Sequence, residues 1–231
     1  MKILAVLLAI AVPYLVGGIN PAIVLSNLIY HRDIRQCGSK NPGFTNFKRV
    51  FGGKIAWLVF VLDIAKSVAV CLLGGWLFGR AFGQHQLGVA FAGLFVMLGH
   101  CFPAWYGFRG GKAFLAGAGA IWCIDWRAGL VAMCVLMLVL FSLHYMSLAS
   151  VFAGLSCPVT LAIVGVQTPW VLALCVLSVS LMVWRHKANL LRLKNGTESK
   201  FYFGHKEEAA SGDETMAEAE CSGKMEREHI A

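Results

Sequence analysis

Three short segments of the chain combine glycine, hydroxyl, amide and cationic side chains, and long apolar runs separate them. They occupy residues 38–49, 99–112 and 185–200. Glycine lets the backbone approach a bound group closely and turn its N–H groups onto an anion. Hydroxyls, amides and cations supply the other donors that a phosphate needs. The repeated combination indicates that the chain binds phosphorylated molecules.

The glycines before Lys112 have the ingredients of a phosphate-binding loop without its complete pattern. Residues 107–112 read GFRGGK, whereas a Walker A motif requires GxxxxGK[ST] after a strand. A single glycine-rich turn before a membrane helix is usually only a turn, and cations at helix ends commonly anchor a protein at lipid head groups. Three donor-rich segments on one face favour a binding site over these structural explanations.

The composition assigns the elements that position these segments to a membrane. Apolar residues make up 58% of the 231 residues and charged residues only 14%, against roughly 25% charged in a soluble domain. We therefore expect an all-α integral membrane protein with helices of about 20 apolar residues. The apolar runs are 3–30, 55–78, 81–106, 113–124 and 128–184.

The number of membrane spans follows from the lengths of these runs. The run 128–184 fits three spans, broken near Ser147 and at 167–169, so the total is seven spans. It is six if the short run 113–124 is re-entrant. An uncleaved first span is favoured over a signal peptide, because the run 3–30 continues far past the candidate cleavage site.

The distribution of Lys and Arg predicts the orientation. With seven spans, the segments 29–54, 107–112 and 185–206 share one side and hold 14 of these residues, whereas the other side holds three. The positive-inside rule places the first group in the cytoplasm, with the N-terminus outside and the C-terminus inside. We expect residues 1–205 to form one polytopic membrane domain, and the acidic residues 206–231 to form a disordered cytoplasmic tail.

The other polar residues suggest structural roles. Asp63 and Lys66 stand three residues apart inside a span and are predicted to pair with each other, supporting the first two segments. His144 is predicted to be a core histidine. The cysteines show no metal-binding spacing, and the basic loops are too short and scattered to favour nucleic acid, so no metal, cofactor or nucleic-acid partner is expected.

The sequences GSKNPGFTNFKR, GHCFPxxxGFRGGK and HKANLLRLKNGTESK, in this order, resemble the three motifs of the PlsY family. The similarity extends from about residue 14 to residue 200. These bacterial membrane enzymes transfer an acyl group from acyl phosphate to sn-glycerol 3-phosphate, which gives lysophosphatidic acid and phosphate. The resemblance implies the same reaction here, without a cofactor, in the inner membrane of a bacterium, with membrane lipids as neighbours.

The resemblance also suggests which residues form the site. Substrate and phosphate groups would be held by Ser39, Asn41, Gly43, Thr45, Asn46, Arg49, His100, Gly110, Gly111, Lys112, Ser147 and Arg192. Arg49 and Lys112 are the first choices for clamping phosphates, and His100 is expected to fix the second motif. His186, Asn189 and Glu198 are the catalytic candidates. We favour a substrate phosphate oxygen over His186 or Glu198 as the proton acceptor.

The chain departs from the usual family pattern at several positions. Lys40 and Phe44 stand where the family usually has Gly and Ala, and Arg109 stands where it usually has Lys. Residues 113–116 read AFLA in place of GVAT, and Lys187-Ala188 replaces the commoner Arg-Glu. Two alternatives follow: a diverged paralogue with another acyl donor or acceptor, or an organophosphate carrier without chemistry. A carrier is disfavoured because the chain shows no clear internal repeat.

Overall fold

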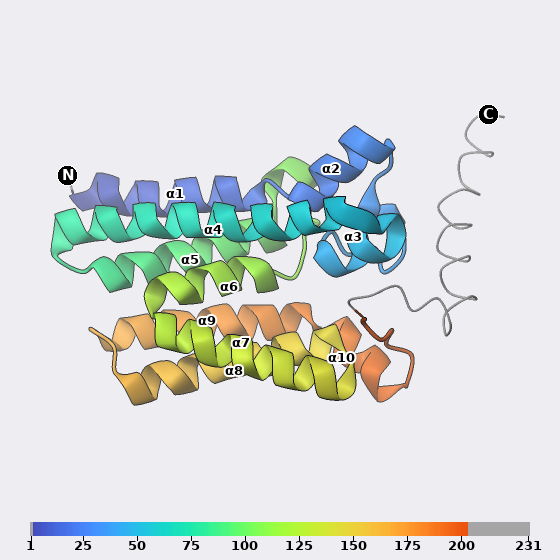
Figure 1. Cartoon of the computed structure of the whole chain (residues 1–231). Helices are drawn as coiled ribbons and strands as arrows, with labels where there is room; N and C mark the ends of the chain where they lie inside the picture. Colours follow the sequence, from blue (N-terminus) through green and yellow to red (C-terminus); the bar gives the residue numbers. More distant parts are fainter. Residues whose placement is uncertain (1, 203–231) are drawn as a thin grey trace. The chain divides into compact units, whose positions relative to one another are not determined.

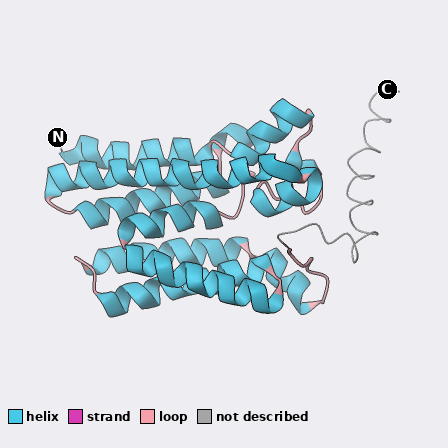
Figure 2. Cartoon of the chain, viewed as in Figure 1, coloured by secondary structure: helices cyan, strands magenta, loops and turns pink. Residues whose placement is uncertain are grey.

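The computed structural model describes residues 2–202, and Figure 2 shows helices and loops but no strand in this part of the chain. The predicted acidic tail lies outside the described residues. The α-helices are α1 (Lys2–Gly18), α2 (Pro21–Tyr30), α3 (Phe44–Phe51), α4 (Gly53–Phe82), α5 (His85–Cys101), α6 (Phe114–Ile124), α7 (Trp126–Leu143), α8 (Met146–Val164), α9 (Pro169–Arg185) and α10 (Lys187–Lys194). Two 3₁₀ turns, η1 (Ile34–Gln36) and η2 (Ala104–Tyr106), complete the description.

The described chain divides into two compact units. One comprises residues 2–19 and 63–201, and the other comprises residues 20–62 with Tyr202. In the first unit α5 packs against α1, α6 and α9, while α8 packs against α7 and α9 (Figure 1). The second unit contains α2, η1 and α3, with α2 and α3 in contact with each other and with η1. The second and third donor-rich segments therefore belong to the first unit, and the first segment belongs to the second.

Glycine allows α1 and α5 to pack with their backbones almost touching. A Cβ atom added at Gly99 would lie 2.0 Å from the Tyr14 carbonyl oxygen, and one added at Gly17 would lie 2.3 Å from the Val96 carbonyl oxygen. Small residues are used in this way where membrane helices associate, because lipid provides no hydrophobic drive to bring them together. The close packing fixes the end of α5, which carries His100.

The predicted helical organisation agrees with the structure in most places. α7, α8 and α9 divide the long apolar run, and the breaks fall at residues 144–145 and 165–168. By length and composition, five helical segments are long enough to cross a membrane, and six if α9 and α10 count as one bent span. α6 has 11 residues, which is about half the hydrocarbon thickness. The count of seven spans therefore stays a prediction.

The first apolar run corresponds to one candidate span, Lys2–Tyr30, with a local break between α1 and α2. Asn20 caps α2 there: its Oδ1 accepts a hydrogen bond from the Ile23 N–H at 3.1 Å, and Pro21 is the first helical residue. One local prediction differs from the structure. His144 is half-buried and caps the C-terminus of α7 with a φ of +61°. The prediction of a core histidine was wrong, because an apolar run on both sides of His144 does not reveal that the helix ends there.

Candidate functional site

The loop that carries Ser39 is held in shape by Asn46. The Asn46 Oδ1 atom accepts a hydrogen bond from the Ser39 N–H at 2.9 Å, and Nδ2 donates to the Cys37 carbonyl oxygen at 3.0 Å. Asn46 is buried, with 1% of its surface exposed. Asn46 was expected to bind substrate directly. In this structure both ends of its amide bond the backbone, so its observed contribution is to shape the loop.

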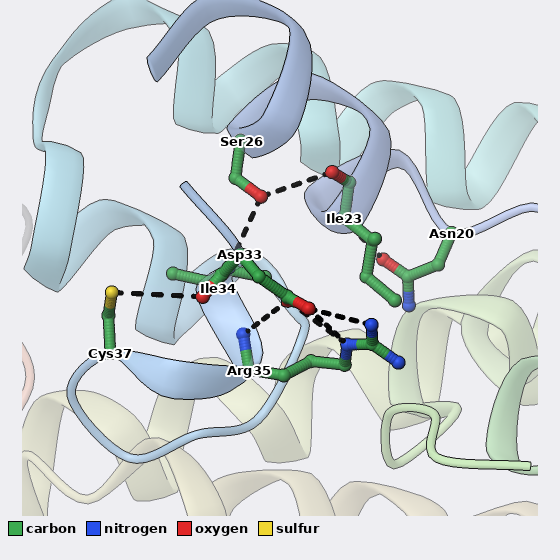
Figure 3. Close-up of polar contacts among 7 residues, drawn as sticks. All are labelled: Asn20, Ile23, Ser26, Asp33, Ile34, Arg35 and Cys37. Atoms are coloured by element: carbon green, nitrogen blue, oxygen red, sulfur yellow. Dashed lines mark hydrogen bonds and ion pairs between the residues drawn. The ribbon is translucent and has the colours of Figure 1, made fainter. Parts of the chain in front are cut away.

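The chain before this loop is braced by side chains that the sequence analysis did not single out (Figure 3). The Ser26 hydroxyl donates to the Ile23 carbonyl oxygen at 3.1 Å and accepts from the Ile34 N–H at 3.3 Å. Asp33 forms an ion pair with Arg35 at 2.6 Å. Asn20 also donates through Nδ2 to the Pro42 carbonyl oxygen at 3.0 Å, so it bridges the start of α2 and the first donor-rich segment. The Asn-Pro dipeptide was the available signal for this cap.

The remaining polar residues of the first segment lie before α3 and along it. Gly43 caps the helix without a side chain, and the backbone N–H groups of a first helical turn favour anions. Ser39 is exposed, whereas Asn41, Thr45 and Arg49 are half-buried. Their binding roles stay predictions, and their surroundings are compatible with an anionic ligand.

In the other unit a buried charge cluster supports the second segment. Asp63 Oδ1 lies 2.8 Å from Lys66 Nζ and 3.4 Å from His100 Nδ1, which confirms the predicted Asp63–Lys66 pair. Lys66 also donates to the carbonyl oxygens of Gly17 at 3.1 Å and Ile19 at 2.7 Å. Asp63 is 1% exposed and His100 is 3% exposed. A buried charge needs such compensation, and the cluster fixes the orientation of the His100 ring.

His100 and the two glycines of the second segment fit closely together. The Gly111 N–H donates to the His100 carbonyl oxygen at 3.0 Å, and the Gly110 N–H donates to the Cys101 carbonyl oxygen at 3.2 Å. Cβ atoms would not fit: one at Gly110 would lie 2.1 Å from the His100 carbonyl oxygen, and one at Gly111 would lie 2.2 Å from the His100 Nε2 atom. This close approach explains why both positions are glycine. It also fixes the position of the backbone at Lys112, which is half-buried.

The third segment begins with a bend at His186. α9 ends at Arg185, and α10 continues at an angle of 51° with His186 as its N-cap residue. Asn189 and Arg192 both lie on α10 and bond the Glu198 carboxylate, and the charge of Glu198 acts on His186.

His186 is held neutral at physiological pH. Its Nδ1 atom lies 2.8 Å from the Met182 carbonyl oxygen, which can only accept, so Nδ1 carries the proton and Nε2 keeps its lone pair. Burial lowers the pKa of His186 to about 4; the nearby charges of Lys112 and Arg185 also lower it, while the Met182 hydrogen bond and Glu198 oppose the shift. An imidazole with this pKa is a weak base.

Glu198 forms the centre of a polar cluster with residues from α8 and α10. Its carboxylate oxygens accept hydrogen bonds from Asn189 Nδ2 at 2.7 Å and from Arg192 Nε at 2.8 Å. Burial raises the pKa of Glu198, but these bonds, the influence of the nearby buried Ser147 side chain and the charge of Arg192 outweigh burial, so that the pKa lies below its ordinary value. Glu198 is therefore ionised and already paired, which makes it a poor proton acceptor.

Two departures from the motif pattern fall where the backbone is left-handed. Lys40 and Ala113 both have a φ of +58°, a conformation that costs about 1–2 kcal/mol for residues other than glycine. The structure therefore gives a physical reason for glycine at both positions. Phe44, where alanine is usual, is 7% exposed and packs against the rings of Trp57 and Phe60. Local aromatic packing therefore accommodates the larger side chain.

The apolar helices and the donor-rich segments define the class: an α-helical integral membrane protein whose polar segments suit phosphate groups. Among residues 2–202 there is no group of three potential metal ligands. Residues 7–196 match the family model described as glycerol-3-phosphate acyltransferase. The chain belongs to the glycerol-3-phosphate acyltransferase family.

Individual relatives match over most of their length. A glycerol-3-phosphate acyltransferase from Lactiplantibacillus plantarum is 35% identical over 88% of this chain and 94% of its own length. One from Thermoanaerobacter pseudethanolicus is 37% identical over 85% of this chain and 95% of its own length. The solved structure of PlsY (YgiH), an integral membrane glycerol 3-phosphate acyltransferase in its glycerol 3-phosphate form, has a TM-score of 0.77 and 31% identity, and the match covers 87% of this chain and 96% of that one. The lysophosphatidic acid form of that protein matches with a TM-score of 0.74 and 30% identity, over 85% of this chain and 95% of that one.

Proposed function

We propose that this protein transfers an acyl group from acyl phosphate to sn-glycerol 3-phosphate, giving lysophosphatidic acid and inorganic phosphate. Family membership supports the acceptor and the product, since related structures are described in glycerol 3-phosphate and lysophosphatidic acid forms. Acyl phosphate as the donor rests on the motif resemblance and on the donor-rich composition of all three segments. An acyl phosphate is already activated, so no covalent enzyme intermediate is needed.

The mechanism rests on one observation: the donor-rich segments supply cations that suit phosphate groups, but their candidate proton acceptors are weak bases. His186 has a pKa of about 4, and the Glu198 carboxylate already accepts two hydrogen bonds. Neither group is suited to remove a proton at neutral pH. The Asn189 Oδ1 atom is buried and has no hydrogen-bond partner among the described residues. It is therefore available to accept a hydrogen bond from the hydroxyl of glycerol 3-phosphate and so to orient that hydroxyl.

The reaction can then proceed because the protein holds the two substrates in the correct relative orientation. The acceptor hydroxyl oxygen bonds to the acyl carbon, the bond between that carbon and the phosphate oxygen breaks, and the phosphate leaves with the electron pair. The hydroxyl proton passes to a phosphate oxygen of the substrates. Lys112 would hold a substrate phosphate and stabilise charge as the phosphate departs, a role that the motif resemblance also suggests for Arg49, while orientation of the two bound molecules supplies much of the rate.

Product analysis tests this proposal directly. Purified protein is incubated with radiolabelled glycerol 3-phosphate and, in parallel, with acyl phosphate, acyl-coenzyme A or acyl carrier protein loaded with the same chain. Labelled lysophosphatidic acid with acyl phosphate alone is the expected result. Product with another donor alone identifies a diverged paralogue. Uptake of label into proteoliposomes without acylation identifies a carrier.

We propose that the site faces the cytoplasm of a bacterial cell and that the protein crosses the inner membrane several times. The asymmetric distribution of Lys and Arg supports this orientation. Single cysteines placed at residues 40 and 194, in a background without native cysteines, should react with an impermeant thiol reagent only from the cytoplasmic side. Reaction of both from outside would reverse the orientation.

A further inference from the structure

Arg185 joins the third donor-rich segment to the second. It is the last residue of α9, and its guanidinium donates through Nε to the Gly111 carbonyl oxygen at 3.0 Å and through Nη2 to the Gly110 carbonyl oxygen at 2.8 Å. Two N–H groups of one planar fork thus bond two consecutive carbonyl groups. A lysine ammonium can bond two carbonyl groups, as Lys66 does, but it lacks the planar fork and would meet the Gly110 and Gly111 carbonyl groups in a different geometry.

Aromatic rings hold the Arg185 guanidinium in this orientation. Its Cζ atom lies 5.3 Å from the centroid of the Phe102 ring and 6.0 Å from that of the Trp184 ring. The two rings are themselves 6.0 Å apart. Cations are attracted to aromatic faces at these distances, so the two rings favour this orientation of the guanidinium.

Both sides of the two-glycine loop are consequently bonded. The N–H groups of Gly110 and Gly111 donate to carbonyl groups at the end of α5, and their carbonyl groups accept from Arg185. Lys112 follows this loop directly, and its charge acts on His186, the neighbour of Arg185. The guanidinium therefore connects the backbone that carries the phosphate-clamping lysine to the bend that carries the histidine.

We propose that Arg185 is a positioning residue, which sets the location of Lys112 relative to His186 by holding the carbonyl groups of Gly110 and Gly111. This role rests on the proposed function, and it adds a residue that lies just before the third motif. It differs from a general positive charge at a membrane surface, because such a charge needs no bidentate geometry and lysine would replace it.

A double-mutant cycle tests whether Arg185 acts through Lys112. Arg185→Gln and Arg185→Lys should each lower kcat/KM for glycerol 3-phosphate by roughly 10- to 100-fold, the effect of losing one or two charge-assisted hydrogen bonds. Combined with Lys112→Ala, either substitution should add almost nothing, because coupled residues are not additive. Lys187→Gln is the matched control: Lys187 lies over the Trp184 ring at 5.2 Å, and its loss should leave activity unchanged.

Hydrogen exchange supplies a readout that does not depend on catalysis. In lipid nanodiscs, amides of residues 107–113 should exchange faster in Arg185→Gln than in the unsubstituted protein, with α5 and α9 unchanged and Lys187→Gln without effect. Multiplicative losses in the cycle, full activity of Arg185→Lys, or unchanged exchange of this loop would each overturn the inference. If the unsubstituted protein transfers no acyl group, the proposed function fails, and exchange alone decides whether Arg185 holds the loop. If Arg185→Gln does not insert, Arg185→Lys carries both measurements.

Discussion

Replacing Gly111 with alanine should displace Lys112 and slow turnover while leaving the protein folded. A Cβ atom at this position would lie 2.2 Å from His100 Nε2 and 2.9 Å from His100 Cδ2, whereas ordinary contacts begin at 3.4 Å. The His100 ring has little freedom to retreat, because Asp63 and Lys66 hold its other side. The loop must therefore move by roughly 1 Å, and a misplacement of this size can cost about 100-fold in rate.

The assay is kcat/KM for glycerol 3-phosphate, measured with protein matched for expression and thermal stability. Gly117→Ala is the control, since its Cβ would meet only the end of the flexible Met97 side chain, at 3.3 Å, and alanine favours an α-helix by about 1 kcal/mol over glycine. Gly117→Ala should retain activity. Near-normal turnover of Gly111→Ala would show that the loop and the His100 ring do not determine the position of Lys112, and the reasoning would fail.

Lys112→Ala should lower kcat by about 10²–10³-fold, as for loss of an oxyanion donor, whereas His186→Gln should retain substantial activity across pH 6–9; the reverse order would make the histidine the general base. In the folded protein the pKa of His186 is about 4, against 6.5 ordinarily, so folding keeps this histidine unprotonated. The free energy of unfolding should therefore fall by about 3 kcal/mol as the pH drops from 6.5 to about 4. Thermal unfolding of His186→Gln should lack this pH-dependent loss of stability. Ala113→Gly should change stability by no more than about 1 kcal/mol, because relief of the left-handed backbone offsets chain entropy; a Tm loss as large as that of Ala113→Val, whose branched side chain is strained there, would contradict this account. Truncation after His205 removes eight acidic residues, and insertion and activity should survive; loss of inserted protein would reveal a structural role for the tail.

The sequence predicted the helices well because charge is costly in lipid, so uncharged runs mark the spans. The breaks near Ser147 and at 167–169 were found in the same way. The Asp63–Lys66 pair was predictable because its partners stand three residues apart on one helix, and the pair is confirmed at 2.8 Å. The family could be recognised because three motifs occur in a fixed order.

Features that depend on tertiary contacts were not predictable. The recruitment of His100 to Asp63 joins residues 37 positions apart in the chain, and no local pattern signals it. Arg185 looks like an ordinary cation at a helix end until its bonds to Gly110 and Gly111 are seen. The bend after Arg185 has no local signal, because residues 185–194 contain neither proline nor glycine.

The ion pair within α4 has a consequence for how the protein enters the membrane. A lone charged side chain at the centre of an inserting helix costs about 2.5–3.5 kcal/mol, but Asp63 and Lys66 stand one turn apart and can neutralise each other before α4 meets another helix. Lys66 then bonds the carbonyl oxygens of Gly17 and Ile19, which are synthesised earlier. The carbonyl groups that bond Lys66 therefore precede α4 in the chain and are already synthesised when α4 is made.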